Sequence, residues 1–303
     1  MEVSDFQEMN GKSVGVIGAS GWLGKPLCTA LRQKGWNVTG FSRSSREDDD
    51  LTWRVWSGEG PVDLTGLDAV INLAGESIDQ RWTEERKVAF RKSRVDLTKD
   101  LSKAVEASGI QILLNASAIG VYGDRGEEEL TEFSSGGEGY LAELCRDWED
   151  AVAVSDSVRV VYLRTGVVLG NGGGAWGRMK PIFNLGVGGR LGNGRQWMPW
   201  IHLNDEIGAI VHCLENEIFG PVNLVAPGAV INREFTKAVG RALRRPTIFP
   251  APAFALTLLL GDFAREGLLA STRVVPKVLE KSGYQFEFPG IDQALGHLVE
   301  SLK

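Results

Sequence analysis

Short apolar segments alternate with longer amphipathic segments over the first half of the chain. The amphipathic segments place apolar residues at helical spacing, so that in residues 22–34 Leu23, Leu27 and Leu31 lie on one face. The short segments are apolar at nearly every position, which is typical of strands covered on both faces of a sheet. Strands are predicted at residues 13–17, 36–41, 68–73, 110–116 and 158–163, and helices at 22–34, 83–108 and 138–154.

Strands joined by helices predict the α/β fold class, as a doubly wound parallel sheet of the Rossmann type with helices on both faces. The pattern changes after Arg164, where glycine-rich loops are expected at residues 170–174 and 186–194. A further strand is predicted at residues 220–225, and further helices at 204–215, 231–243 and over much of the chain after Arg245.

This change of pattern divides the chain into two expected parts. The first is residues 1–165, with its sheet completed by parts of 200–228, and the second is a smaller α/β lobe at residues 166–303, including a helical region at about 250–298. The apolar run at residues 254–260 is too short to span a bilayer, and we interpret it as a buried helix.

Glycines recur at every third position between the first predicted strand and the first helix. Gly18 permits a tight turn, Gly21 lets the backbone approach a pyrophosphate, and Gly24 lets helix and strand pack closely. The amides and dipole of the helix N-terminus then favour phosphate groups. Because the triplet follows a strand and opens a helix, it predicts a dinucleotide site rather than an ordinary turn. The residues expected to hold the cofactor here are Gly18, Ala19, Ser20, Gly21, Trp22, Leu23 and Gly24.

The end of the second predicted strand indicates which dinucleotide binds. NAD-binding proteins place an Asp or Glu there to hold the ribose hydroxyls, whereas this chain has Ser42 and Arg43. Arg43 can pair with a 2′-phosphate, Ser42 can donate a hydrogen bond, and Arg46 is a second cation. The alternative is that both arginines only face solvent, and the acidic run at residues 47–50 lies close by. We predict NADP(H) as the cofactor.

Composition excludes several classes of protein. A net charge of −6 and a pI of about 5.3 give no basic surface for nucleic acid, and the polar, acidic residues 1–11 contain no apolar signal segment. The three cysteines form no CxxC pair, which favours a reducing, cytoplasmic setting, and the three histidines are too dispersed for a metal site. We expect a small-molecule ligand and no nucleic-acid, membrane or metal partner, and the oligomeric state stays open.

Several motifs resemble a known superfamily. The glycine triplet, Leu73–Ala74–Gly75 after Asn72, Ser117, and Tyr122 before Gly123 together resemble the extended short-chain dehydrogenase/reductases. The stretches 81–83, 164–170, 200–205 and 283–286 narrow the resemblance to the atypical SulA-type "nucleoside-diphosphate-sugar epimerase" family (SDR39U-like), including its C-terminal domain of unknown function. The resemblance covers nearly the whole chain and implies an NADP-binding Rossmann fold. It further implies that Leu73, Ala74, Gly75, Ser117, Arg164 and Val167 lie near the cofactor.

The resemblance also shows a departure at the catalytic helix. Superfamily enzymes use a Tyr-x-x-x-Lys pair, in which the lysine lowers the tyrosine pKa. If Glu149 is aligned with the glutamate that often follows that lysine, Leu141 and Cys145 occupy the two positions. If Tyr140 is taken as the tyrosine, Leu144 replaces the lysine. The pair is incomplete in either alignment.

Other residues are candidates for catalysis. Ser117 matches the superfamily's catalytic serine when one residue is inserted before Tyr122, and the alternative is a serine that caps the strand end. Tyr122 lines the pocket or packs in the core with its hydroxyl bonded, and Tyr140 is a candidate for a displaced acid. Cys145 is interpreted as a buried apolar residue.

Candidate substrate residues lie in two regions. Glu76 and Arg94 follow the third predicted strand, and Arg94 is expected either to bind phosphate or carboxylate or to form a structural salt bridge. Arg195, Trp197 and Trp200 belong to a glycine-rich segment that either forms a substrate wall or is a surface loop pinned by tryptophans.

Two functions follow from these features. The first is an NADP-dependent oxidoreductase or epimerase that acts on a small polar, anionic or sugar-nucleotide substrate, with proton transfer left to Ser117, a water or another group. The alternative is a non-catalytic NADP(H)-binding redox sensor or scaffold, which the incomplete pair favours.

Overall fold

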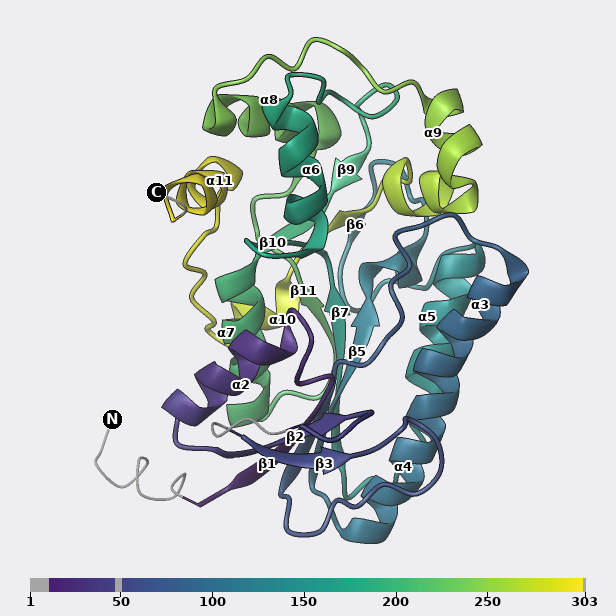
Figure 1. Cartoon of the computed structure of the whole chain (residues 1–303), viewed down its shortest axis with the longest axis vertical. Coiled ribbons are helices and arrows are strands. Elements are labelled where there is room, and N and C mark those ends of the chain that lie inside the picture. Colours follow the sequence, from purple (N-terminus) through teal and green to yellow (C-terminus); the bar gives the residue numbers. More distant parts are fainter. Residues whose placement is uncertain (1–10, 47–50, 302–303) are drawn as a thin grey trace.

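The computed structural model describes residues 11–46 and 51–301, and its centre is a seven-stranded sheet in which all neighbours are parallel (Figure 1). The strands run in the order β11 (Gly220–Leu224), β7 (Arg159–Thr165), β5 (Ile112–Ala118), β4 (Ala69–Asn72), β1 (Ser13–Ile17), β2 (Asn37–Ser42) and β3 (Thr52–Val55). The predicted α/β fold class is therefore confirmed. The carboxyl ends of all these strands meet along one edge, because the strands are parallel.

Helices cover both faces of the sheet, as Figure 1 shows. One face carries α2 (Gly24–Gln33) and α7 (Leu203–Glu215), which bury Leu27, Leu31 and Ile210 completely in one core cluster with β1 and β7 side chains. The other face carries α3 (Glu84–Arg91), α4 (Leu97–Ser108) and α5 (Tyr140–Asp150). Burial on both faces explains why the strands are apolar at successive positions.

The long predicted helix after residue 83 forms, with an interruption. Thr83 caps α3 by accepting a hydrogen bond from the backbone N–H of Arg86 at 3.4 Å. A π-helical turn at Lys92–Asp96 then joins α3 to α4, which ends at Gly109 in the left-handed conformation, with φ of 70°. The π turn was not predicted, because the hydrophobic period alone does not distinguish i→i+5 from i→i+4 bonding.

The second part of the chain forms a lobe above the sheet in Figure 1. Its core packs Trp176, Trp200, Phe235 and Leu295, each almost fully buried. The elements of this lobe are β8 (Val167–Leu169), α6 (Gly174–Asn184), β9 (Trp197–Met198), β10 (Trp200–His202), β12 (Val230–Ile231), α8 (Asn232–Leu243), α9 (Ala253–Leu260), a π turn (Ala264–Leu268) and α11 (Ile291–Glu300). Helix α10 (Lys277–Lys281) instead packs against β11 of the main sheet (Figure 1). A short ladder between β6 (Glu129–Leu130) and β13 (Arg273–Val274) ties this tail to the loop after the 3₁₀ turn Ile119–Tyr122.

Three local features differ from the sequence-based expectations. Strand β3 and helix α6 were not predicted, since β3 is a short edge strand and α6 begins with glycine and contains Pro181. The interpretation of residues 254–260 as a buried helix is wrong. Helix α9 forms there, but it buries no residue, and Phe254 and Leu258 are 77% and 73% exposed. Apolar composition fixed the helix, but not whether another element covers it.

Candidate functional site

The three glycines of the first turn have three different environments. Gly18 adopts a positive φ of 84°, which only glycine adopts without strain. Gly21 is exposed, and a Cβ there would meet only the carbonyl oxygen of Gly18, at 3.1 Å. Gly24 is buried, and a Cβ there would overlap that same oxygen and lie 2.7 Å from the Cα of Ala19. The turn therefore has a position that needs the positive φ of glycine, an open position and a tightly packed one, as a pyrophosphate-binding turn requires.

The neighbouring strand β4 brings a second loop against this turn. A Cβ on Gly18 would lie 3.2 Å from the carbonyl carbon of Leu73. The loop is held by Asn72, whose Oδ1 accepts from the N–H of Ala74 at 3.1 Å and whose Nδ2 donates to Asn115 at 2.8 Å. The residues predicted to line the cofactor here range from half-buried Leu73 and Ala74 to exposed Gly75.

The end of β2 carries two exposed cations. Arg43 and Arg46 are both exposed, and the guanidinium carbon of Arg46 lies 5.5 Å from the ring centroid of Trp53. Ser42 is buried, donates to the carbonyl of Ser44 at 2.7 Å and accepts from Arg46 Nε at 3.2 Å. The Ser42 hydroxyl therefore organises the turn that presents the arginines. The acidic run at residues 47–50 lies outside the described residues.

Trp22 links the phosphate turn to the second lobe. Its indole N–H donates to the carbonyl of Asn171 at 2.9 Å. Cβ atoms on Gly173 and Gly174 would lie only 2.7 and 2.5 Å from the indole ring, so the ring is seated on glycine backbone. The sequence reasoning took Trp22 as a cofactor contact and missed this link, because it joins residues about 150 positions apart.

Ser117, Arg164 and Tyr122 come together in one buried network. Glu149 accepts from Arg164 Nε at 2.8 Å and Nη2 at 2.7 Å, and from the Ser117 hydroxyl at 2.6 Å. Tyr122 is fully buried, accepts from Arg164 Nη1 at 3.0 Å and donates to Asn223 Oδ1 at 2.7 Å. Burial opposes the charge of Arg164, and the bonds to Glu149 outweigh it, so the pKa of Arg164 is raised above its ordinary value.

This network bears on the roles expected for its members. Ser117 is only 4% exposed, and its hydroxyl already donates a hydrogen bond to the Glu149 carboxylate. Tyr122 matches the core-packing alternative, since its hydroxyl has partners on both sides and no exposed surface. Arg164 turns its guanidinium into the protein, so that only its backbone borders the sheet edge.

Helix α5 shows the incomplete pair directly. Leu141 and Cys145 are buried, and burial raises the pKa of the Cys145 thiol to about 12, which leaves it protonated and unreactive. The Tyr140 hydroxyl donates to the carbonyl of Lys87 at 3.2 Å, and its ring lies 5.3 Å from that of Trp82. Burial raises the Tyr140 pKa, against the lowering effect of Arg91 and Arg94. Proton release from Tyr140 is therefore disfavoured.

The five substrate candidates do not share one environment. Trp200 is fully buried and donates to the carbonyl of Gly228 at 3.0 Å, so its expected place on a substrate wall is wrong. Trp197 is half-buried and donates to Glu127 at 2.8 Å, whereas Arg195 and Glu76 are exposed. Arg94 lies in the π turn between α3 and α4, where its guanidinium carbon is 5.0 Å from the ring centroid of Trp148.

His202 and Asp205 hold the second lobe together. His202 Nδ1 caps α7 by accepting from the N–H of Asn204 at 3.0 Å. Asp205 accepts from the N–H groups of Glu287 at 2.7 Å and Phe288 at 2.9 Å. Burial, with His297 close by, lowers the pKa of His202 to about 4, so that it is neutral at ordinary pH.

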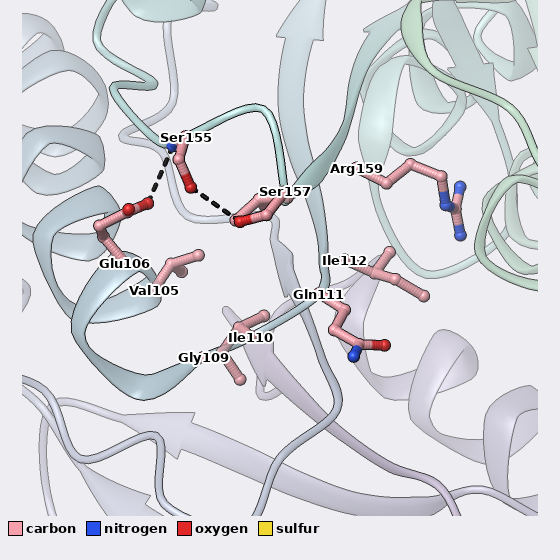
Figure 2. Close-up of a pocket in the computed structure, with 10 residues that line it drawn as sticks. Val105, Glu106, Gly109, Ile110, Gln111, Ile112, Ser155, Ser157 and Arg159 are labelled. Carbon is pink, nitrogen blue, oxygen red and sulfur yellow. Dashed lines mark hydrogen bonds between the residues drawn. The ribbon is translucent and has the colours of Figure 1, made fainter.

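Figure 2 shows a cavity of about 480 Å³ at the amino ends of β5 and β7, the edge of the sheet opposite the glycine turn. Glu106 accepts from the N–H of Ser155 at 2.9 Å there, and the hydroxyls of Ser155 and Ser157 are 2.8 Å apart. Arg159 points away and donates to three carbonyl groups at and after the end of α7. No predicted site residue lines this cavity, or a second one of about 760 Å³ between α2 and α7, and we place the candidate site at the glycine turn instead.

Residues 11–46 and 51–301 contain neither a metal-ligand cluster nor a membrane-spanning helix. In these ranges no three His, Cys, Asp or Glu side chains cluster as metal ligands would. In the same ranges, no helix combines the length and the apolar character that crossing a membrane requires.

Comparison with known proteins agrees with this geometry. Residues 14–225 match the "NAD dependent epimerase/dehydratase family", and residues 251–298 match a "Domain of unknown function (DUF1731)". An epimerase family protein of Mycobacterium bovis is 44% identical over 290 residues, covering 94% of this chain and 96% of its own.

Two solved structures are similar as well. That of the human epimerase family protein SDR39U1 with NADPH is 34% identical, with a TM-score of 0.89 over 95% of this chain and 99% of that one. That of a nucleoside-diphosphate sugar epimerase from Corynebacterium glutamicum is 31% identical, with a TM-score of 0.79 over 98% of this chain and 60% of that one. The resemblance drawn from the motifs is confirmed, and the chain belongs to the NAD dependent epimerase/dehydratase family.

Proposed function

We propose that this chain binds NADP(H) at the carboxyl edge of its sheet and uses it on a small polar substrate. Residues 1–165 hold the cofactor in this proposal, and residues 166–303 face the substrate. The observation that carries it is the turn at Gly18, Gly21 and Gly24, with one glycine at a positive φ, one open and one tightly packed.

The end of β2 supports NADP(H) over NAD(H). Arg43 and Arg46 are both exposed, three residues apart, and Ser42 shapes the turn that presents them. A 2′-phosphate adds a dianion at this place, and guanidinium groups bind phosphate with charge-assisted hydrogen bonds. The human relative, similar to this chain over almost its whole length, was crystallised with NADPH.

In this proposal, different segments along the carboxyl edge of the sheet contact different parts of the cofactor. The open backbone at Ser20–Trp22 would approach the pyrophosphate, the loop Leu73–Gly75 would border the riboses, and the backbone at Arg164–Val167 would face the nicotinamide. When bound, the nicotinamide supplies a hydride at C4. The Ser117 hydroxyl already donates a hydrogen bond to the Glu149 carboxylate, and the Tyr140 hydroxyl donates one to the backbone carbonyl of Lys87. We therefore propose that water carries the substrate proton.

The substrate in this proposal is a small polar or sugar-nucleotide molecule, bounded by Glu76, Arg94, Arg195 and Trp197. The Corynebacterium glutamicum structure named as a nucleoside-diphosphate sugar epimerase supports this class. A reducing, cytoplasmic setting is part of the proposal, since Cys28, Cys145 and Cys213 are all free and buried.

Cofactor titration tests the proposal. Fluorescence titration should give tighter binding of NADPH than of NADH. Arg43→Ala together with Arg46→Ala should weaken NADPH binding about thirtyfold while leaving NADH unchanged, because each of the two lost charge-assisted contacts contributes on the order of 1 kcal/mol at an exposed site. Lys34→Ala, an exposed cation at the far end of α2, is the matched control. Equal binding of the two cofactors, or none, would refute the NADP(H) assignment.

A non-catalytic redox sensor or scaffold is the second candidate, and the buried Cys145 in the lysine position favours it. The NADPH-saturated protein, followed at the absorbance of the reduced nicotinamide against carbonyl compounds and nucleotide sugars, separates the two. Turnover supports the enzyme, whereas no turnover, unchanged by Ser117→Ala, supports the sensor.

A further inference from the structure

Arg94 is a half-buried cation that forms no ion pair within residues 11–46 and 51–301, although the charge of Glu76 acts on it. Its Nη2 donates to the carbonyl of Glu76 at 2.8 Å, and its Nη1 lies 3.4 Å from the Ser93 hydroxyl. Its guanidinium carbon stands 5.0 Å from the ring centroid of Trp148, as in a cation–π contact. No carboxylate of residues 11–46 or 51–301 forms an ion pair with it, so the salt bridge expected as one alternative does not form.

Other arginines in the interior of this chain are compensated. Arg164 is held bidentately by Glu149, and Arg159 donates to three backbone carbonyls. Arg91, one turn before Arg94, is paired with Asp147. A guanidinium has five N–H donors, and the contacts of Arg94 occupy only two of its nitrogens. Because a partly buried charge without an ion pair is costly, Arg94 retains the capacity to receive an anion.

The Arg94 guanidinium lies next to the loop that we propose borders the cofactor. A Cβ on Gly75 would lie 3.1 Å from Nη2 and 3.2 Å from Cζ, so the guanidinium lies directly against the loop after β4. That loop touches Gly18 through Leu73. On its other side Arg94 faces Trp148 of α5, and the groups that act on its charge are Tyr140, Cys145 and the carboxylate of Glu76. In Figure 1, α3 and α5 run side by side, which brings the two helices together here.

We propose that Arg94 binds the carboxylate group of the substrate. It would supply the positive charge that is missing because this chain lacks the lysine of the Tyr-x-x-x-Lys pair. The inference rests on the proposed function for the position of the cofactor. The π turn supplies the cation from α3 and α4 rather than from α5. A planar fork with one positive charge matches a carboxylate, which is a planar monoanion with two acceptors. A phosphate dianion would need a second cation, and the nearby Arg91 is already neutralised by Asp147.

Calorimetric titration of the full chain saturated with NADP⁺, which cannot reduce a ketone, tests this proposal. The probes are pyruvate, phenylpyruvate and 2-oxoglutarate, each beside its uncharged methyl ester, and inorganic phosphate. We expect at least one acid to bind tenfold or more tightly than its ester, and Arg94→Gln to remove that preference. Arg94→Lys, which keeps the charge and loses the fork, should retain part of it. Lys92→Gln is the matched control, because Lys92 is exposed and paired with Glu59.

Each outcome decides the point. The proposal is wrong if no acid binds, if the acid preference survives Arg94→Gln, or if phosphate binds more tightly than every acid. NADP⁺ affinity and thermal midpoint are measured first for each variant. If the wild type does not bind NADP⁺, the proposed function is wrong. If it binds NADP⁺ but shows no preference for the acids over their esters, only the role of Arg94 is wrong.

Discussion

Replacing Glu149 by Gln removes the carboxylate that compensates Arg164. The side chains of Glu149 and Arg164 are only 12% and 11% exposed, so water cannot take the place of the lost charge. Glutamine keeps one acceptor oxygen, and because both oxygens of Glu149 accept from Arg164, its amide group points donors at the guanidinium in either orientation. The variant therefore loses one charge-assisted bond and gains a donor that faces another donor.

The expected loss in free energy of unfolding is about 3 kcal/mol. Breaking a buried ion pair from one side costs roughly 3–5 kcal/mol, and the residual exposure of both groups puts this pair at the low end. Ser117→Ala removes only the 2.6 Å bond to the same carboxylate, and a hydrogen bond to a charged group contributes about 1.5 kcal/mol at the lower limit. The two variants should therefore differ by a factor of about two in their effect.

Urea unfolding followed by far-UV circular dichroism measures both free energies. If the slope of the free energy of unfolding against urea concentration is unchanged, the variants and the wild type expose the same surface area on unfolding. A loss below about 1 kcal/mol for Glu149→Gln would refute the reasoning, because the charge of Arg164 would then be compensated by something other than Glu149. An effect of Ser117→Ala on activity alone, with stability intact, would return the serine to a catalytic role.

Three further predictions use other parts of the structure. Gly24→Ala should abolish NADPH binding in a fluorescence titration and lower the thermal midpoint, since the new Cβ would lie 2.7 Å from the Cα of Ala19; unaltered affinity would contradict the packing. Gly173→Ala should weaken NADPH binding several-fold and change the tryptophan emission spectrum, because its Cβ would lie 2.7 Å from Trp22; an unchanged spectrum would show that the ring does not rest there. Burial raises the pKa of Glu206 from 4.5 to about 8. Since the folded chain holds this proton more tightly than the unfolded chain, its contribution to stability is full below pH 4.5 and is lost as pH rises through 8. Glu206→Gln should thus flatten the fall in stability over that window, and identical pH profiles for the two proteins would refute the shift.

Much of the fold followed from local pattern. Residues 13–17 form β1 as expected, and the helix predicted at residues 22–34 forms as α2 (Gly24–Gln33). The glycine spacing also indicated three separate backbone requirements, and Gly18, Gly21 and Gly24 meet them. Such features depend on neighbours within a few residues, where side-chain size and backbone freedom act directly.

What the tertiary structure alone decided is which groups meet. The sequence determined a parallel α/β sheet with a dinucleotide turn, because hydrophobic period and glycine spacing are local properties. It could not show that Glu149 compensates Arg164, that Trp22 rests on residues 171–174, or that α9 is left uncovered. Burial and charge pairing depend on elements distant in sequence, so the free Arg94 becomes visible only once the other interior arginines are seen to have partners.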